Sequence, residues 1–276
     1  MGSSQSHVSN LIRTPGMFSR RDFLKLAGAA LLSVAASGLA KPGPASLAPS
    51  VIYHGSRKYR KIAMTYDDCW HPEVLEALMA MLEPYPDFHF TFFAIGDAIE
   101  IDEAVKPGIW KRLYAAGHEI GYHTYTHVAF PSTKDMLNDF DRWMRELQHV
   151  LGFAPKVHFA RPPGNDLTLS FQELCLERGL VVTQYSTGFE SSSLDESMRL
   201  AARATNGDIV QMHTYQDPPH NRFDVDISAK AVPYLAAQGF TLVTMSQLYD
   251  DVLREQYSSD GCETGPGESL TRTCLE

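Results

Sequence analysis

The segment KIAMTYDDCWHPEVLEALMAML, residues 61–82, contains a short apolar run, a pair of aspartates and then a longer stretch in which apolar residues recur with helical spacing. The run from Lys61 to Tyr66 predicts a buried strand, and Pro72 to Leu82 predicts a helix. A strand followed by a helix is the repeating unit of α/β proteins with parallel sheets. Repetition of this unit along the chain would therefore define such a fold.

The same pattern occurs seven times along the chain. Further strands are predicted at Phe88 to Ala94, His118 to Tyr122, Lys156 to Ala160, Gly179 to Tyr185, Asp208 to Met212 and Gly239 to Thr244. Further helices are predicted at Lys106 to Ala115, Lys134 to Leu151, Leu167 to Arg178, Leu194 to Ala204, Val225 to Ala237 and Ser246 to Gln256. Seven units in series predict a mostly parallel sheet, either closed into a barrel or open and doubly wound. Polar residues follow four of the strands, which favours an α/β fold with a barrel-like sheet of about seven parallel strands.

The composition is that of a globular protein. With 276 residues, of which 44% are hydrophobic and 21% charged, the chain is long enough to bury one sizeable core. Its formal net charge is -9. Because an acidic body repels polyanions, we expect no nucleic acid partner. We divide the chain into a signal peptide at 1–40, a linker at 41–55, one main domain at 56–256 and a tail at 257–276.

A basic segment followed by an apolar one lies near the start of the chain. Residues 19–25 are SRRDFLK, and an Ala-rich apolar stretch runs from Leu26 to Ala40. This order is typical of a twin-arginine export signal, whose partner is the twin-arginine translocase. The alternatives are a first helix of the domain or a membrane anchor, but the stretch is too short to span a bilayer comfortably. We expect a secreted, periplasmic or cell-envelope protein with no stable membrane span in the mature form.

The four cysteines fall into different settings. Cys262 and Cys274 bracket a tail rich in Gly, Pro, Ser and Thr, and we hypothesise that they form a disulfide after export. The alternative is two free thiols on the tail. Cys175 lies among apolar residues and is expected to be a small core residue.

Two polar motifs after predicted strands indicate a metal site. Asp67 and Asp68 follow the first strand, although adjacent aspartates are also common in turns and helix caps. His123 and His127 follow the third strand, and two histidines four apart share one face of a helical turn, close enough to bind one ion. The alternative for the histidines is a surface or capping pair. A carboxylate from the first motif would complete a His2Asp set with open coordination positions, as in catalytic metal sites.

Two further strand ends carry polar residues. Arg161 leads the rigid turn Arg161-Pro162-Pro163-Gly164-Asn165 after the fourth strand, and His213 follows the sixth. Taken alone, the turn is an ordinary surface loop, and a lone histidine is more often packed or solvated than catalytic. In combination, four strand ends supply residue types that one hydrolytic mechanism requires.

At this point the sequence resembles the polysaccharide deacetylase family, the NodB-homology carbohydrate esterases of family 4. The resemblance covers about residues 60 to 245 and rests on Thr65-Tyr66-Asp67-Asp68, His123-Thr124-Tyr125-Thr126-His127, Arg161-Pro162-Pro163 and Ile209-Val210-Gln211-Met212-His213. It implies a distorted (β/α) barrel of the NodB-like type over the main domain. It also implies a divalent metal, commonly zinc, with cobalt, nickel and manganese as alternatives, bound by Asp68, His123 and His127.

The family's catalytic roles are implied residue by residue. Asp67 would act as general base on a metal-bound water, and Arg161 would pair with it. The backbone N–H of Gly164 would stabilise the oxyanion, and His213 would protonate the leaving amine or alcohol. Trp70, Tyr125 and Pro163 are the residues expected to contact substrate, although Trp70 is equally well explained as a core aromatic.

The resemblance implies an enzyme that removes N-acetyl groups from amino sugars in a carbohydrate polymer or oligomer, of the peptidoglycan or chitin type. One alternative is an esterase of O-acetylated xylan or another amide hydrolase on the same fold, because a fold fixes chemistry more tightly than substrate. A different class of function is an inactive carbohydrate-binding protein.

Three departures from the family pattern set limits on this resemblance. Cys69-Trp70-His71-Pro72 stands where Gly-Pro is usual, and Asn165 replaces a glycine. Cys69 is expected to be a bystander rather than a ligand. The aspartate that normally follows the fifth strand and orients the acid histidine is missing, and Glu190 or Asp217 could replace it. We expect activity to survive this last change with an altered pH profile.

Overall fold

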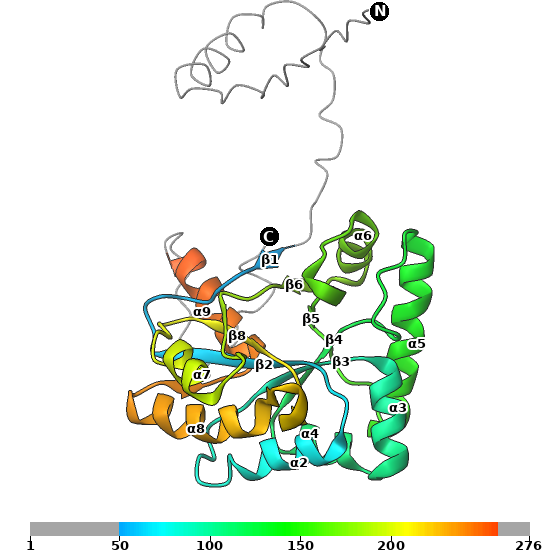
Figure 1. The fold of residues 1–276 in the computed structure, drawn as a ribbon. Coiled ribbons are helices and arrows are strands. Elements are labelled where there is room, and N and C mark those ends of the chain that lie inside the picture. Colours follow the sequence, from blue (N-terminus) through cyan, green and yellow to red (C-terminus); the bar gives the residue numbers. More distant parts are fainter. Residues whose placement is uncertain (1–49, 259–276) are drawn as a thin grey trace, which may run out of the picture. The chain divides into compact units, whose positions relative to one another are not determined.

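A parallel sheet forms the centre of residues 50–258, the part of the chain that the structure, a computed structural model, describes (Figure 1). Its nine strands are β1 (Val51–Ile52), β2 (Lys61–Asp68), β3 (Thr91–Ala94), β4 (Glu119–Tyr122), β5 (Phe159–Ala160), β6 (Val181–Thr183), β7 (Thr187–Gly188), β8 (Ile209–Met212) and β11 (Thr241–Leu242). Their order is β1-β6-β5-β4-β3-β2-β8-β7, and β11 pairs with the start of β2. All seven predicted strands are present, and β1 and β7 are short additions.

The chain itself brings the two edges of this sheet together. β6 and β7 stand near opposite ends of the strand order, yet only residues 184–186 separate them. Because consecutive Cα atoms are about 3.8 Å apart, the two strands lie within about 15 Å of each other at this connection. Within it the Gln184 N–H donates to Ile52 O beside β1, and the Ser186 N–H donates to Ile209 O on β8. The sheet therefore curls into the distorted barrel that the sequence predicted.

Eight helices accompany the strands in the described part of the chain. They are α2 (Pro72–Ala80), α3 (Gly96–Val105), α4 (Ile109–Ala115), α5 (Thr133–Leu151), α6 (Leu169–Arg178), α7 (Leu194–Ala201), α8 (Asp224–Ala237) and α9 (Met245–Ser258). The sequence predicted all of these except α3. Ile101 and Val105 of α3 are exposed whereas Ile99 is buried. Apolar residues therefore lie on both the exposed and the buried face of α3, and the sequence shows no helical period there.

Two apolar cores form on the two sides of the curled sheet. Side chains alternate along a strand, so neighbouring residues of β2 belong to different cores. The larger core lies between the sheet and the surrounding helices and includes Ile62, Met64 and Tyr66 of β2. The smaller core, inside the barrel, includes Ala63, Phe93, Phe159, Ile209 and Leu248.

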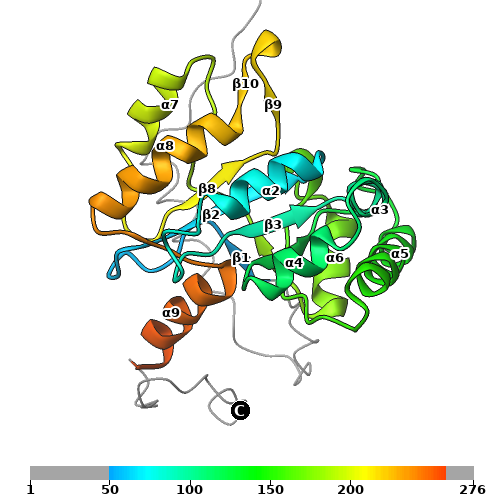
Figure 2. The same cartoon turned by 90° about the horizontal axis from the view of Figure 1, so that it is seen from below.

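Helix α9 covers the amino ends of the central strands, on the side away from the β9–β10 hairpin (Gln216–Asp217 and Arg222–Phe223; Figure 2). The first residues of three strands are bonded to it: Lys61 pairs with Asp251, the Met245 N–H donates to Thr91, and the Ser246 N–H donates to Glu119. Polar groups at the carboxyl ends of the strands have no such cover from α9.

The predicted linker at 41–55 extends too far into the domain. Val51–Ile52 form β1, which pairs with Val182 and Thr183 of β6. The Gly55 N–H also donates to Gly207 O at 2.7 Å. A strand of two residues leaves no periodic pattern, so the sequence does not distinguish it from a linker.

Several sequence predictions lie outside the described residues. These are the twin-arginine signal at 1–40 and the disulfide between Cys262 and Cys274. Cys175 is buried in the larger core, as predicted. Within residues 50–258 we find no helix with the length and apolarity that crossing a bilayer requires.

Gly207 is a backbone position that a larger residue cannot occupy without strain. Its φ is +74°, and an added Cβ would lie 2.4 Å from the Ser56 carbonyl oxygen. We predict that Gly207→Ala lowers the free energy of unfolding by about 3 kcal/mol, from the left-handed backbone and the clash together. Urea denaturation measures this loss.

The matched control is Gly179→Ala. Gly179 also has a positive φ, +65°, but no atom lies within 4 Å of an added Cβ. Its loss should be about 1 kcal/mol, the cost of the left-handed backbone alone. Equal losses in the two variants would show that the contact between Gly207 and residue 56 is not tight.

Candidate active site

Strand β2 brings two adjacent aspartates to the carboxyl end of the barrel. It runs through Asp68, two residues beyond the predicted end at Tyr66. Adjacent strand residues point to opposite faces, but Asp68 has a left-handed backbone (φ 65°), as does Cys69 (φ 66°). The regular alternation therefore ends at Asp68, and both carboxylates join the polar side chains at this end of the barrel.

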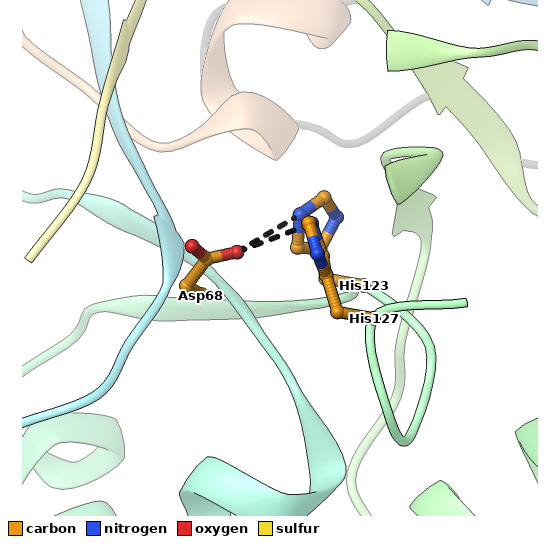
Figure 3. Close-up of side chains that lie close together, drawn as sticks. All are labelled: Asp68, His123 and His127. Atoms are coloured by element: carbon orange, nitrogen blue, oxygen red, sulfur yellow. Dashed lines mark ion pairs between the residues drawn. The ribbon is translucent and has the colours of Figure 1, made fainter. Parts of the chain in front are cut away.

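Asp68, His123 and His127 face one another in one cluster (Figure 3). Asp68 Oδ1 lies 3.5 Å from His123 Nε2 and 3.4 Å from His127 Nε2, and one ligand atom from each residue falls within 4.8 Å of the others. Contacts of this length exceed a hydrogen bond. Asp68 Oδ1 is buried and has no hydrogen-bond partner in the described part of the chain. A buried carboxylate oxygen without a partner is costly unless a cation binds it.

The bonds behind these side chains also fit a metal site. His123 Nδ1 bonds to the Arg161 carbonyl oxygen at 2.7 Å, which leaves Nε2 as the nitrogen available to bind a metal ion. Asp68 Oδ2 accepts a hydrogen bond from the Tyr215 hydroxyl at 3.0 Å, which leaves Oδ1 available to bind the same metal ion. Outer partners of this kind orient metal ligands in proteins. Two imidazoles and one carboxylate with open positions suit zinc and several other divalent ions.

The histidine loop is not the helical turn that the spacing predicted. Residues 123–127 lie in an irregular loop in which Thr124 (φ 66°) and His127 (φ 58°) are left-handed. The two rings nevertheless approach to 5.0 Å between centroids. Asp139 of α5 accepts hydrogen bonds from the Tyr125 N–H and the Tyr122 hydroxyl and so holds the loop in place. Tertiary contacts, rather than helical period, bring the pair together.

Asp67 is held on both carboxylate oxygens. Arg161 Nη1 donates to Oδ1 and Gln211 Nε2 donates to Oδ2, each at 2.6 Å. Burial raises the pKa of Asp67, but the Arg161 guanidinium, two histidines and the Gln211 hydrogen bond outweigh burial and hold the pKa below its ordinary value. The carboxylate is therefore ionised and fixed in orientation. Gln211 is the polar residue in the otherwise apolar β8, and this break in the apolar run is the signal in the sequence for its role.

His213 is paired with Glu190. Glu190 Oε1 accepts the backbone N–H of His213 at 2.5 Å and contacts Nδ1 at 2.9 Å, and Oε2 also lies 2.9 Å from Nδ1. Burial lowers the pKa of His213, but the hydrogen bond and charge of Glu190 and the charges of Asp67 and Asp68 raise it to about 9. Asp217, the other carboxylate considered, bonds instead to His220 at 2.6 Å.

The turn after β5 leaves open space beside a glycine. Gly164 (φ 59°) and Asn165 (φ 60°) are both left-handed, and Pro163 is buried. No atom lies within 4 Å of a Cβ placed on Gly164. The side chain of Asn165 lies 3.4 Å from that of Gln211.

The residues expected to contact substrate differ in exposure. The Tyr125 side chain is only 2% exposed, its hydroxyl donates to Glu100 at 2.8 Å, and Arg142 covers its ring. This side chain supports the histidine loop and presents almost no surface to a ligand. Trp70 is half-buried beside Cys69, which is fully buried and is not part of the metal cluster.

The predicted site residues therefore form one connected group. Asp67 and Asp68 on β2, His123 and His127 after β4, Arg161 after β5 and His213 after β8 are linked by the contacts above or through Tyr215. Sequence reasoning missed Tyr215 and Asp139, because no spacing marks a residue whose partner lies far away in the chain.

The chain is similar to known polysaccharide deacetylases. A model of the family described as polysaccharide deacetylase matches residues 54–183. The chain is 26% identical over 201 residues to peptidoglycan-N-acetylglucosamine deacetylase PgdA of Listeria monocytogenes, which covers 71% of this chain and 40% of that protein. It is 26% identical over 214 residues to a peptidoglycan-N-acetylglucosamine deacetylase of Bacillus cereus, which covers 75% of each. The chain thus spans less than half the length of the Listeria protein.

A solved structure has the same fold. It is that of a CE4 family pseudoenzyme from Bacillus anthracis, with a TM-score of 0.64 and 19% identity over 74% of this chain and 70% of that one. A mutant of that pseudoenzyme has restored enzymatic activity. At this level of identity the likeness shows the fold alone, so function has to be argued from the site.

Tyr215 gives a test of the metal site that leaves all three ligands in place. We predict that Tyr215→Phe weakens zinc binding about 10-fold, because Asp68 Oδ2 loses the hydroxyl that orients it. Competition with a chromophoric chelator measures the affinity. Tyr185→Phe, at a tyrosine that is 39% exposed, is the control and should bind zinc as the unaltered protein does. Unchanged affinity in Tyr215→Phe would mean that Asp68 does not bind the ion through the arrangement described.

Proposed function

Because the chain belongs to the polysaccharide deacetylase family, we propose that it is a metal-dependent hydrolase that removes N-acetyl groups from amino sugars in a peptidoglycan- or chitin-type carbohydrate. One observation carries this proposal. The cluster of Asp68, His123 and His127 is connected to an ionised carboxylate, Asp67, and to a histidine with a raised pKa, His213. Amide hydrolysis needs one group that accepts a proton and one that donates it.

The cluster of Asp68, His123 and His127 would hold the metal. A divalent cation bound there would polarise the acetyl carbonyl and lower the pKa of a water molecule. Zinc is the first candidate, with cobalt, nickel and manganese as alternatives. The donor set and the unpartnered Asp68 Oδ1 support a cation of this kind.

Asp67 would act as the general base. It lies beside the metal cluster, is ionised, and is fixed in place by Arg161 and Gln211. Each carboxylate oxygen has two lone pairs, so one hydrogen bond to each leaves room for a proton from the attacking water. Arg161 orients this base and keeps it charged, since a guanidinium does not deprotonate in proteins.

The backbone N–H of Gly164 would stabilise the oxyanion of the tetrahedral intermediate. The open space beside Gly164 supports the approach of a substrate to this part of the backbone. Peptide N–H groups in a fixed turn need no reorganisation when negative charge develops on the carbonyl oxygen.

His213 would protonate the departing amine. Glu190 binds Nδ1, which leaves Nε2 as the atom that transfers the proton. We infer that Glu190 takes the part of the aspartate that the family usually has after the fifth strand. Its charge keeps His213 protonated near neutral pH, which a general acid requires.

A cleft beside the site offers room for a polymer. It has a volume of about 690 Å³, and its lining includes Val74, Ala77, Tyr215, Asp217 and Arg222. Tyr215 forms a shared wall, because its hydroxyl bonds to Asp68. A lining that contains both apolar and polar side chains suits a sugar, which has both C–H faces and hydroxyls.

Two other functions are compatible with the same fold, an esterase and an inactive carbohydrate-binding protein. An esterase of O-acetylated xylan would use the same residues, and the relatives named for peptidoglycan favour the amide substrate. An inactive carbohydrate-binding protein would retain the fold, as the Bacillus anthracis pseudoenzyme does. The presence of both the base and the acid supports activity here. Relatives that act on peptidoglycan also support an extracytoplasmic location, and export through the twin-arginine translocase stays a prediction.

Acetate release tests the activity directly. We predict acetate release from N-acetylglucosamine oligomers or peptidoglycan, abolished by a chelator and restored by zinc. Loss of an outer partner of a metal ligand costs about 10- to 100-fold. Asp68→Asn alters a ligand itself, so it should lower kcat by more than this. Asp87→Asn, at an exposed aspartate, is the control. Activity that survives chelation contradicts the metal, and oligomer binding without acetate release would identify a binding protein.

The basic limb of the pH profile tests Glu190. His213 acts in its protonated form, so activity falls as pH rises through the His213 pKa. Glu190→Gln removes the charge that raises this pKa from its ordinary value of about 6.5. We predict that the limb moves down by about two pH units, with both proteins measured at saturating zinc.

Asp217→Asn is the matched control for Glu190→Gln, because Asp217 bonds to His220 and not to His213. It should leave the basic limb where it is. If the basic limb moves in Asp217→Asn and stays in place in Glu190→Gln, Asp217 rather than Glu190 orients His213.

A further inference from the structure

A second carboxyl group lies behind Glu190. It belongs to Asp224, the first residue of α8, whose side chain is buried with an exposed fraction of 2%. Asp224 Oδ2 accepts the backbone N–H of Tyr215 at 2.7 Å. Asp224 and Glu190 line the same cavity. Burial, the charge of Glu190 and hydrogen bonding between the two side chains raise the pKa of Asp224. Three acidic or basic side chains thus stand in a row, from Asp224 through Glu190 to His213.

A hydrogen bond between two carboxyl groups needs a proton. Ionised carboxylates only accept hydrogen bonds, so either Glu190 or Asp224 has to be protonated. Glu190 Oε1 already accepts the backbone N–H of His213 and Oε2 contacts its ring nitrogen, so both oxygens of Glu190 already serve as acceptors. Asp224 has one backbone donor on Oδ2, so its other oxygen can carry the proton. Asp224 is therefore the donor and Glu190 the acceptor.

The other groups around Asp224 do not replace this proton. Tyr66 lies on β2 with its hydroxyl bonded to Ser228, and burial raises its pKa, so it stays neutral. The Ser228 hydroxyl donates to the Asp224 carbonyl oxygen rather than to its side chain. Tyr215 also has a raised pKa, from burial and the charge of Asp68. The side chains of His220 and Arg222 share a cavity of about 310 Å³ with Asp224 and Glu190, but neither forms an ion pair with Asp224.

We propose that Asp224 is a positioning residue, which keeps its proton at neutral pH and donates it in a hydrogen bond to Glu190, so that Glu190 stays aimed at His213. The proposal rests on the proposed function, in which His213 is the general acid. Glutamate is longer than aspartate by one rotatable bond and so loses more side-chain freedom when it is held in one orientation. A second anchor on Glu190 compensates for this greater freedom. Burial and the charge of Glu190 raise the pKa of Asp224 to about 8, in agreement with a protonated group.

Two substitutions at Asp224 separate the proton from the charge. Asp224→Asn keeps an acceptor for the Tyr215 N–H and a donor for Glu190, as the protonated acid does. Asp224→Ala removes both. With N-acetylglucosamine oligomers at saturating zinc and pH 7, we expect Asp224→Ala to lower kcat at least about 10-fold with little change in KM. Asp224→Asn should restore kcat to within about threefold of the unaltered protein.

Asp226→Asn and Asp226→Ala change an exposed carboxylate in the same helical turn, which bonds to Gln216, and should not differ from each other. If Asp224→Asn loses as much kcat as Asp224→Ala, an ionised Asp224 is required and the proposal is wrong. It is also wrong if Asp224→Ala keeps its kcat.

A second measurement needs no catalysis and no alanine variant. A carboxyl group whose pKa is raised by folding binds one more proton in the folded than in the unfolded state, so it makes stability fall as pH rises toward the folded pKa. Between pH 5 and pH 8 we expect the melting temperature of the unaltered protein to fall relative to that of Asp224→Asn. A constant difference would mean that Asp224 is ionised throughout and shares no proton. If no acetylated sugar is hydrolysed, the proposed function fails, and the melting curves still decide whether Asp224 holds a proton.

Discussion

A buried guanidinium holds together the end of the barrel on which the site is built. Arg161 is fully buried and reaches from the end of β5 to Thr65 and Asp67 on β2, and also toward the carbonyl oxygens of Thr183 and Gln184 after β6. Removing the partner of a buried charge costs about 3–5 kcal/mol, so this pairing constrains several strand ends at once. The same contact keeps Asp67 ionised. Fold and chemistry therefore depend on one interaction.

The two groups that we propose as base and acid are kept in opposite charge states by their neighbours. Arg161 lowers the pKa of the carboxyl of Asp67, and Glu190 raises the pKa of the imidazole of His213. Enzymes that hydrolyse amides near neutral pH commonly separate base and acid through such local environments. Here each group is fixed by a charged partner of the opposite sign, and Asp224 adds a neutral acid behind Glu190. The charge states of Asp67 and His213 thus follow from their local partners.

The alternation of apolar runs and helical stretches was enough to predict seven strands and seven helices of an α/β barrel. Side chains alternate between the two faces of a sheet with period two, whereas the packing of a helix imposes a period near 3.6. It failed at α3, where exposed Ile101 and Val105 obscure the period. It also failed for the loop of His123 and His127. Their spacing suggested a helical turn, whereas Asp139 of α5 holds the loop in an irregular conformation.

The sequence alone determined which chemical groups stand at the strand ends, since residue type and position after a strand are local properties. Only the tertiary structure decided which distant residues support them. Glu190 rather than Asp217 reaches His213, Tyr215 bonds to Asp68, and Asp224 lies behind Glu190. These partners are up to 147 residues apart. Their distances depend on how several strands and helices pack together, and no short stretch of sequence contains that information.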